Sequence, residues 1–150
     1  MSPEQARALL GVARALADYI LVDGPSIFAP AIAEVVQHSE LTTLVVERNR
    51  IGLQAALKKM PALQALAARP GAVGAVLINK TPFGEFLGPV EFGMRLGCGI
   101  IGVISPATDL DAAGESRTLP VLNRPDMPFS QSIEEVARRL NPGPGRFLAS

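Results

Sequence analysis

Apolar positions along the chain follow two patterns, a helical spacing of three to four residues and short continuous runs. The helical spacing predicts helices over residues 3–17, 28–40, 52–69 and 130–140, and a short helix within 81–97. The continuous runs predict buried strands over 19–23, 41–47, 71–80 and 98–105, with a short fifth strand over 118–124. Ser2 and Ser130 are the predicted N-caps of the first and last helices, and Pro61 is predicted to kink or divide its helix.

Strands that are apolar throughout and alternate with helix-length segments are typical of a parallel sheet covered on both faces. The sequence therefore predicts an α/β fold, a three-layer sandwich with a mostly parallel sheet. Residues 1–140 form one predicted domain, and the Pro- and Gly-rich residues 141–150 form a predicted flexible tail. Ligands of such sheets bind at the carboxyl ends of the strands. The polar residues predicted at those ends are Asp23, Glu47, Asn79, Lys80 and Ser105.

Composition narrows the classes of function. The 14 basic and 14 acidic side chains balance, so no net charge attracts the chain to nucleic acid or to anionic lipid. The apolar runs are shorter than the roughly 20 residues of a membrane span, and with no signal peptide and a single cysteine we expect a cytoplasmic protein. His38 and Cys98 are too few for a zinc site, and Cys98 is predicted to be a small buried hydrophobe rather than a nucleophile.

The order of the strand ends resembles the later part of a P-loop ATPase of the ParA/MinD class, the deviant Walker group that includes ATPases of the CpaE/TadZ kind. The segments "YILVDGPS", "LTTLVVE", "AVLINKTP", "GIIGVISP" and "LPVLNRPDMPFSQSIEEVARRL" follow the family order from about residue 16 to 140. The resemblance implies that Asp23 is the carboxylate that holds Mg²⁺ or the attacking water. It also implies that Asn79, with Lys80, reads adenine, and that the loop at Pro106 lies against the base. Ser105 stands where the family has its proline, one position before Pro106.

The chain departs from the family in one large feature, because its 150 residues contain no Gly-rich Walker A loop ending in lysine. That loop cradles phosphates with backbone N–H groups and a lysine. We therefore expect no unaided ATP hydrolysis, and expect ATP and Mg²⁺ as cofactors only if a missing N-terminal part or a partner supplies the loop. The sequence fits either part of a longer ATPase or a degenerate relative. The family's P-loop strand lies in mid-sheet, so its loss implies open edges and self-association or a partner protein.

The expected function is positioning or assembly of a cellular machine, such as a pilus, a flagellum, or the division or partition apparatus. Two alternatives stay open: a pseudo-ATPase scaffold that binds no nucleotide, and part of a bacterial tyrosine-kinase-type P-loop domain. Simpler roles also stay open for two site residues, since Asp23 before Gly-Pro suits a turn and Asn79 suits a strand end.

Overall fold

The computed structural model describes residues 1–80, 87–107 and 118–140. The predicted tail, 141–150, lies outside the described residues, as does the domain boundary drawn at its start. The elements in chain order are α1 (Pro3–Leu16), α2 (Pro30–Gln37), β1 (Thr42–Glu47), α3 (Arg50–Leu66), β2 (Val73–Ile78), α4 (Pro89–Leu96), β3 (Gly99–Ile104), α6 (Pro120–Asn123) and α7 (Pro128–Leu140).

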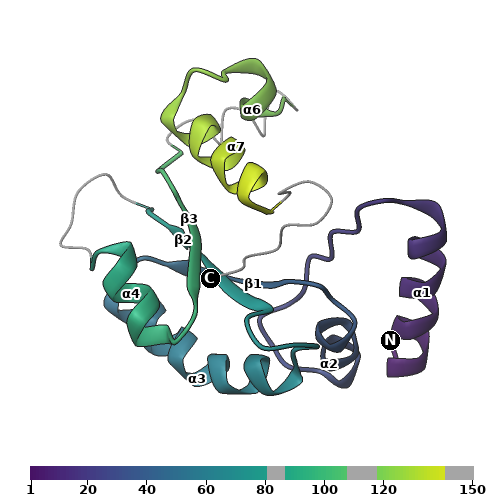
Figure 1. Ribbon diagram of the computed structural model, residues 1–150. Helices are drawn as coiled ribbons and strands as arrows, with labels where there is room; N and C mark the ends of the chain where they lie inside the picture. The colour runs from purple at the N-terminus through teal and green to yellow at the C-terminus, as the bar shows by residue number, and fades with distance from the viewer. Residues whose placement is uncertain (81–86, 108–117, 141–150) are drawn as a thin grey trace.

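The sheet is parallel, in the order β1-β2-β3, with β2 in the centre (Figure 1). β1 and β2 pair in continuous register from Thr42 opposite Val73 to Glu47 opposite Ile78. β3 pairs with the other side of β2, with one irregularity at Ala75/Val76. The helical crossovers α3 and α4 connect these strands, as parallel strands require.

Helices cover both faces of the sheet and give three layers. α3 and α4 cover one face, and α7, on which α6 packs, covers the other (Figure 1). The larger core cluster lies under α3 and α4, where Met60, Leu77 and Phe92 are almost fully buried. A smaller cluster joins Val76 and β3 to Val136 of α7. The predicted α/β sandwich with a parallel sheet is confirmed.

The predicted strand over residues 19–23 is wrong. The segment between α1 and α2 forms no strand, and its apolar side chains are exposed, Leu21 to 93% and Tyr19 to 69%. A strand is stabilised by hydrogen bonds to a neighbour, and no described strand lies beside these residues. An apolar run alone therefore did not suffice to make a strand.

Two details around the last helices also differ from prediction. Residues Pro120–Asn123 form the short helix α6 rather than a fifth strand, since Pro120 fits a first helical turn. Ser130 does not cap α7, which begins two residues earlier at Pro128. Its buried hydroxyl instead donates to the Pro120 carbonyl at 3.2 Å and ties α7 to α6.

Two local sequence signals, the N-cap at Ser2 and the proline at position 61, can be compared with the helices observed. Ser2 caps α1: its Oγ accepts from the Gln5 N–H at 3.2 Å, and the Gln5 side chain accepts from the Ser2 N–H at 2.8 Å. This reciprocal capping box confirms the predicted cap. Pro61 lies inside α3, but the helix runs undivided from Arg50 to Leu66.

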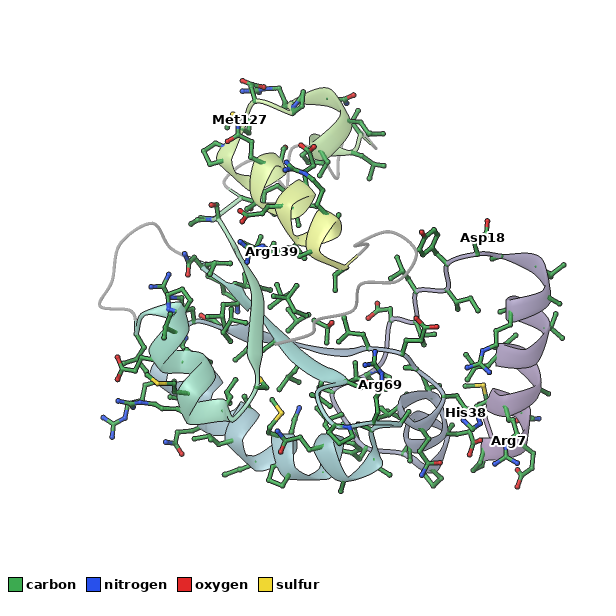
Figure 2. All side chains as sticks on the ribbon, in the orientation of Figure 1. Arg7, Asp18, His38, Arg69, Met127 and Arg139 are labelled. Carbon is green, nitrogen blue, oxygen red and sulfur yellow. The ribbon has the colours of Figure 1, made fainter. Side chains whose placement is uncertain are left out.

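α1 is fastened to α2 by a buried carboxylate. Glu34 is 6% exposed, and its Oε1 lies 2.6 Å from Arg7 Nε and 3.2 Å from His38 Nδ1. Arg14 of α1 also donates to the His38 carbonyl at 2.5 Å. Figure 2 shows Arg7 and His38 together at this contact, on the opposite side of the molecule from α4. The hydrogen bond from Arg7 lowers the pKa of Glu34 below its ordinary value.

We expect Phe92→Ala to lower the free energy of unfolding by about 3–5 kcal/mol, because it removes a fully buried ring from the centre of the larger core. Val90→Ala on the same helix is the matched control. Val90 is 76% exposed, so its loss should change stability by less than about 0.5 kcal/mol. Urea unfolding measures both, and equal effects would contradict the core assignment.

We expect Arg7→Gln to destabilise the α1–α2 contact at neutral pH and to lose that effect in acid. The pKa of Glu34 is lower in the folded chain than in the unfolded one, so its stabilisation is present above the unfolded value, about 4.3, and disappears as the pH falls through the folded value. Urea unfolding near neutral pH and at about pH 3 tests this. Arg138→Gln removes only an exposed pair with Glu134 and serves as the control.

Candidate functional site

The carboxyl ends of the three strands meet at one edge of the sheet, as parallel strands dictate. Two backbone hydrogen bonds extend the pairing past the strand ends. Arg48 N–H donates to the Ile78 carbonyl at 2.9 Å, and Asn79 N–H donates to the Ile104 carbonyl at 3.0 Å. Asn79 is thereby fixed between the ends of β1 and β3, in the central position of this edge.

The side-chain amide of Asn79 holds a buried hydrogen-bond acceptor. Its side-chain oxygen Oδ1 has no hydrogen-bond partner among the described residues. Burying an unpaired polar atom costs about 1–3 kcal/mol, and native proteins usually satisfy such atoms. An unpaired acceptor at the carboxyl edge of a parallel sheet therefore indicates a place where a ligand donor could bind.

Lys80 lies beside Asn79 and is paired across the sheet. Its Nζ lies 2.9 Å from Glu47 Oε2, and the Lys80 side chain is 68% exposed. Sequence reasoning placed both residues at strand ends but missed the ion pair. The signal that could have found it is the β1–β2 register, which puts Glu47 opposite Ile78, two residues before Lys80.

The loop after β3 is anchored to α7. Ser105 N–H donates to Ser132 Oγ at 3.1 Å, and that hydroxyl donates in turn to the Phe129 carbonyl at 2.7 Å. Pro106 follows, half-buried, at the same edge as Asn79. The structure therefore brings Asn79, Lys80 and Pro106 to one edge.

Asp23 lies on the exposed segment between α1 and α2, and no hydrogen bond or ion pair joins it to another described residue. The segment is held a few residues later, where Lys59 Nζ donates to the Ser26 carbonyl at 2.7 Å. In the part of the chain that the structure describes, no three His, Cys, Asp or Glu side chains gather as a metal site. Asp23 thus does not form a metal site with these residues alone.

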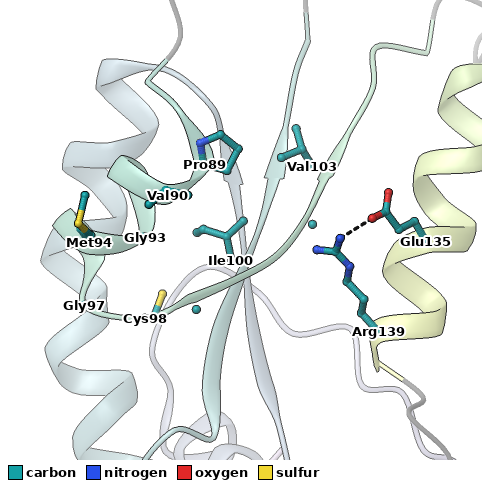
Figure 3. Close-up of a pocket in the computed structure, with 12 residues that line it drawn as sticks. Pro89, Val90, Gly93, Met94, Gly97, Cys98, Ile100, Val103, Glu135 and Arg139 are labelled. Carbon is teal, nitrogen blue, oxygen red and sulfur yellow. Dashed lines mark hydrogen bonds and ion pairs between the residues drawn. The ribbon is translucent and has the colours of Figure 1, made fainter. Parts of the chain in front are cut away.

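A cavity of about 830 Å³ lies elsewhere, along the outer edge of β3 between α4 and α7. Figure 3 shows the Glu135–Arg139 ion pair on one wall, with Cys98 and Ile100 on β3's side. Arg139 Nη1 also donates to the Ile101 carbonyl at 2.9 Å. Burial raises the pKa of the Cys98 thiol, and the cavity lining holds no histidine to activate it. We therefore assign the candidate site to the carboxyl edge and not to this cavity.

Comparison with known proteins supports the fold and not a sequence family. No family model matches the chain, and no curated protein matches it.

No described helix is both long and apolar enough to cross a membrane.

Solved structures of three ATPase-type proteins superpose on nearly the whole chain. The MinD cell division protein of Aquifex aeolicus superposes with a TM-score of 0.80 and 21% sequence identity; the match covers 99% of this chain and 64% of the MinD chain. The MinC:MinD complex of the same organism gives a TM-score of 0.79. The ParA family ATPase of Chlorobium tepidum has a TM-score of 0.75 and 20% identity, and the match covers 95% of this chain and 58% of that one. MinD of Pyrococcus horikoshii, complexed with Mg-ADP, has a TM-score of 0.75 and 16% identity, and the match covers 93% of this chain and 57% of that one. The chain has the fold of these ATPases and spans about 60% of their length.

We expect the Cys98 thiol to be alkylated more slowly in the folded chain than in the urea-unfolded chain, because burial raises its pKa and leaves less thiolate. Iodoacetamide labelling followed by mass spectrometry measures both rates at one pH. Cys98→Ser, which should show no labelling, is the control. Faster labelling in the folded chain would revive the nucleophile hypothesis.

Proposed function

We propose that this chain is a nucleotide-binding domain of the MinD/ParA ATPase type that lacks its own phosphate-binding loop and works by association with a polypeptide that supplies one. The observation that carries the proposal is the unpaired, buried Asn79 Oδ1 at the carboxyl edge of a sheet with the MinD and ParA fold.

The chemistry of the edge suits an adenine base. An asparagine amide can pair with adenine through two bonds, accepting from the N6 amino group and donating to a ring nitrogen. Asn79 Oδ1, which has no partner among the described residues, could accept the hydrogen bond from the adenine N6 amino group. Lys80, held by Glu47, and the half-buried Pro106 flank it and would border the base.

The phosphates and the metal need more than this chain provides. No Gly-rich loop with a lysine occurs in its 150 residues, so unaided ATP hydrolysis is not part of the proposal. Mg²⁺ is commonly held by one or two carboxylates together with phosphate oxygens. Asp23 is exposed and otherwise unpaired, so it could supply that carboxylate once a loop had bound the phosphates.

The proposed cellular role is positioning or assembly of a machine such as a pilus, a flagellum, or the division or partition apparatus, in the cytoplasm and in the manner of CpaE-like ATPases. Support comes from the fold shared with the Aquifex cell division protein MinD, which forms a complex with MinC. The alternatives are a scaffold that binds no nucleotide and part of a tyrosine-kinase-type P-loop domain.

We expect Mg-ATP to shift the side-chain amide resonance of Asn79 in ¹H–¹⁵N NMR spectra of the chain, and Mg-GTP to shift it less, because guanine lacks the N6 donor. Asn79→Ala should abolish the other ATP-induced shifts at the carboxyl edge. Asn123→Ala, at an exposed position on α6, should leave them unchanged and is the matched control.

Two results would count against the proposal. If Mg-ATP at millimolar concentration moves no resonance at the carboxyl edge, the scaffold that binds no nucleotide is favoured. If the shifts persist in Asn79→Ala, the base lies elsewhere.

A further inference from the structure

The outer edge of β3 holds one pair of backbone groups that no other described residue bonds. The Ile104 carbonyl accepts from an N–H just after β2, so the backbone groups of Ile104 face β2. Those groups alternate along a strand, so the N–H and carbonyl of Val103 point outward. On either side of Val103, side chains of α7 bond the Ile101 carbonyl and the Ser105 N–H. Val103 itself is left with an outward donor and an outward acceptor.

α7 lies directly on this edge strand. Val136 is so close to Gly102 that a Cβ atom added there would lie 2.5 Å from Val136 Cγ2. An early residue of α7 bonds the backbone just after β3, and a late residue bonds the first half of the strand, so helix and strand run antiparallel. The midpoint between Glu135 and Arg139, one residue after Val136, is therefore level with the region of Val103.

The charges along this edge are complementary to a second copy of themselves. Glu135 and Arg139 form an ion pair on the α7 wall of the cavity between α4 and α7, which we call the β3 groove (Figure 3). Their side chains are 56% and 53% exposed, and the other described residues that line the groove are uncharged. A second α7 in antiparallel orientation would set its Arg139 opposite Glu135, and its Glu135 opposite Arg139. A parallel helix would instead oppose like charges, which is unfavourable.

The α4 wall of the β3 groove offers an apolar contact on the opposite face of the sheet. Met94 lines this wall and is 72% exposed (Figure 3). A two-fold axis through the outer edge of β3 would place α4 of a second copy beside α4, as it places α7 beside α7. Met94 would then be covered by the second copy, and a flexible thioether side chain adapts readily to such a contact.

We infer that the outer edge of β3 is a surface at which two copies of this chain associate about a two-fold axis. Val103 of each copy pairs with Val103 of the other in antiparallel fashion and exchanges two N–H···O bonds, so the two sheets become one. The Glu135–Arg139 pairs of the two α7 helices then form a four-membered network. Because the joined strands are antiparallel, the carboxyl edges of the two copies face in opposite directions. The inference does not rest on the proposed function.

The first test is the mass of the full chain in analytical ultracentrifugation, where we expect a species of twice 15.8 kDa. Glu135→Lys sets positive charges opposite each other across the axis and should raise the Kd of the dimer about tenfold or more. Glu134→Lys is the matched control, because Glu134 forms the same kind of pair with Arg138 but does not line the β3 groove. A chain that stays monomeric at about 1 mM, or equal effects of both variants, would overturn the inference.

Hydrogen exchange of the unsubstituted chain gives a readout that does not depend on how a variant folds. The amide of Val103 should exchange about tenfold more slowly at dimeric than at monomeric concentration, while that of Ile104, which already faces β2, should change little. The amide of Val45 is the control, since it points outward from the opposite edge of the sheet. Protection at Val45 instead of Val103, or at neither residue, would contradict association through β3.

Photo-cross-linking identifies what occupies the β3 groove. With p-benzoylphenylalanine at position 94 of the full chain, we expect a covalent dimer whose cross-linked peptide comes from α4 or β3 of the second copy. The same residue at position 51 is the control, because Ile51 is 81% exposed on α3 and does not line the groove. Cross-linking within one chain to residues 141–150, or a dimer that forms equally from position 51, would overturn the inference.

Discussion

The structure depends on the burial of one strand on all sides. β2 has a parallel neighbour on each edge and a helix layer on each face, and Ala75 and Leu77 have no exposed surface. Such close packing requires small residues at points of contact. A Cβ atom on Gly74 would lie 2.8 Å from Ile101 Cδ1, and one on Gly102 would lie 2.5 Å from Val136 Cγ2. Because both neighbours of β2 run parallel to it, all three strand ends emerge at the edge that carries Asn79.

The sequence predicted this central part well, and the reason is physical. Residues 71–78 form a continuous apolar run, and a strand covered on both faces needs one. Residues 19–22 also form an apolar run but no strand. The difference lies in neighbours: pairing depends on a strand from elsewhere in the chain, and apolar periodicity does not reveal whether one is present. Pro120 gave a similar error, since "TLPVLN" suits a short edge strand or a first helical turn.

The candidate site was predictable in position but not in chemistry. Asn79, Lys80 and Pro106 follow strands, so their arrival at one edge follows from a parallel topology. The burial of Asn79 Oδ1 and the pairing of Lys80 with Glu47 depend on the register between strands and on side-chain packing, which no local pattern contains. The prediction that Asp23 ends a strand is wrong, because residues 19–23 form no strand, while its predicted role as the metal-holding carboxylate stays a prediction.

The asymmetry of the sheet connects the failed strand with the candidate site. Ser132 and Arg139 of α7 each bond one backbone group at or just after β3, whereas no described helix bonds the outer side of β1 in this way, and Val45 is 59% exposed. An unprotected edge beside apolar surface favours aggregation, so its presence needs a cause. The apolar run at 19–23 has the composition of a buried strand and lies exposed between α1 and α2. Both features leave apolar surface that the described residues do not cover, at Val45 beside the sheet and at Leu21 between α1 and α2.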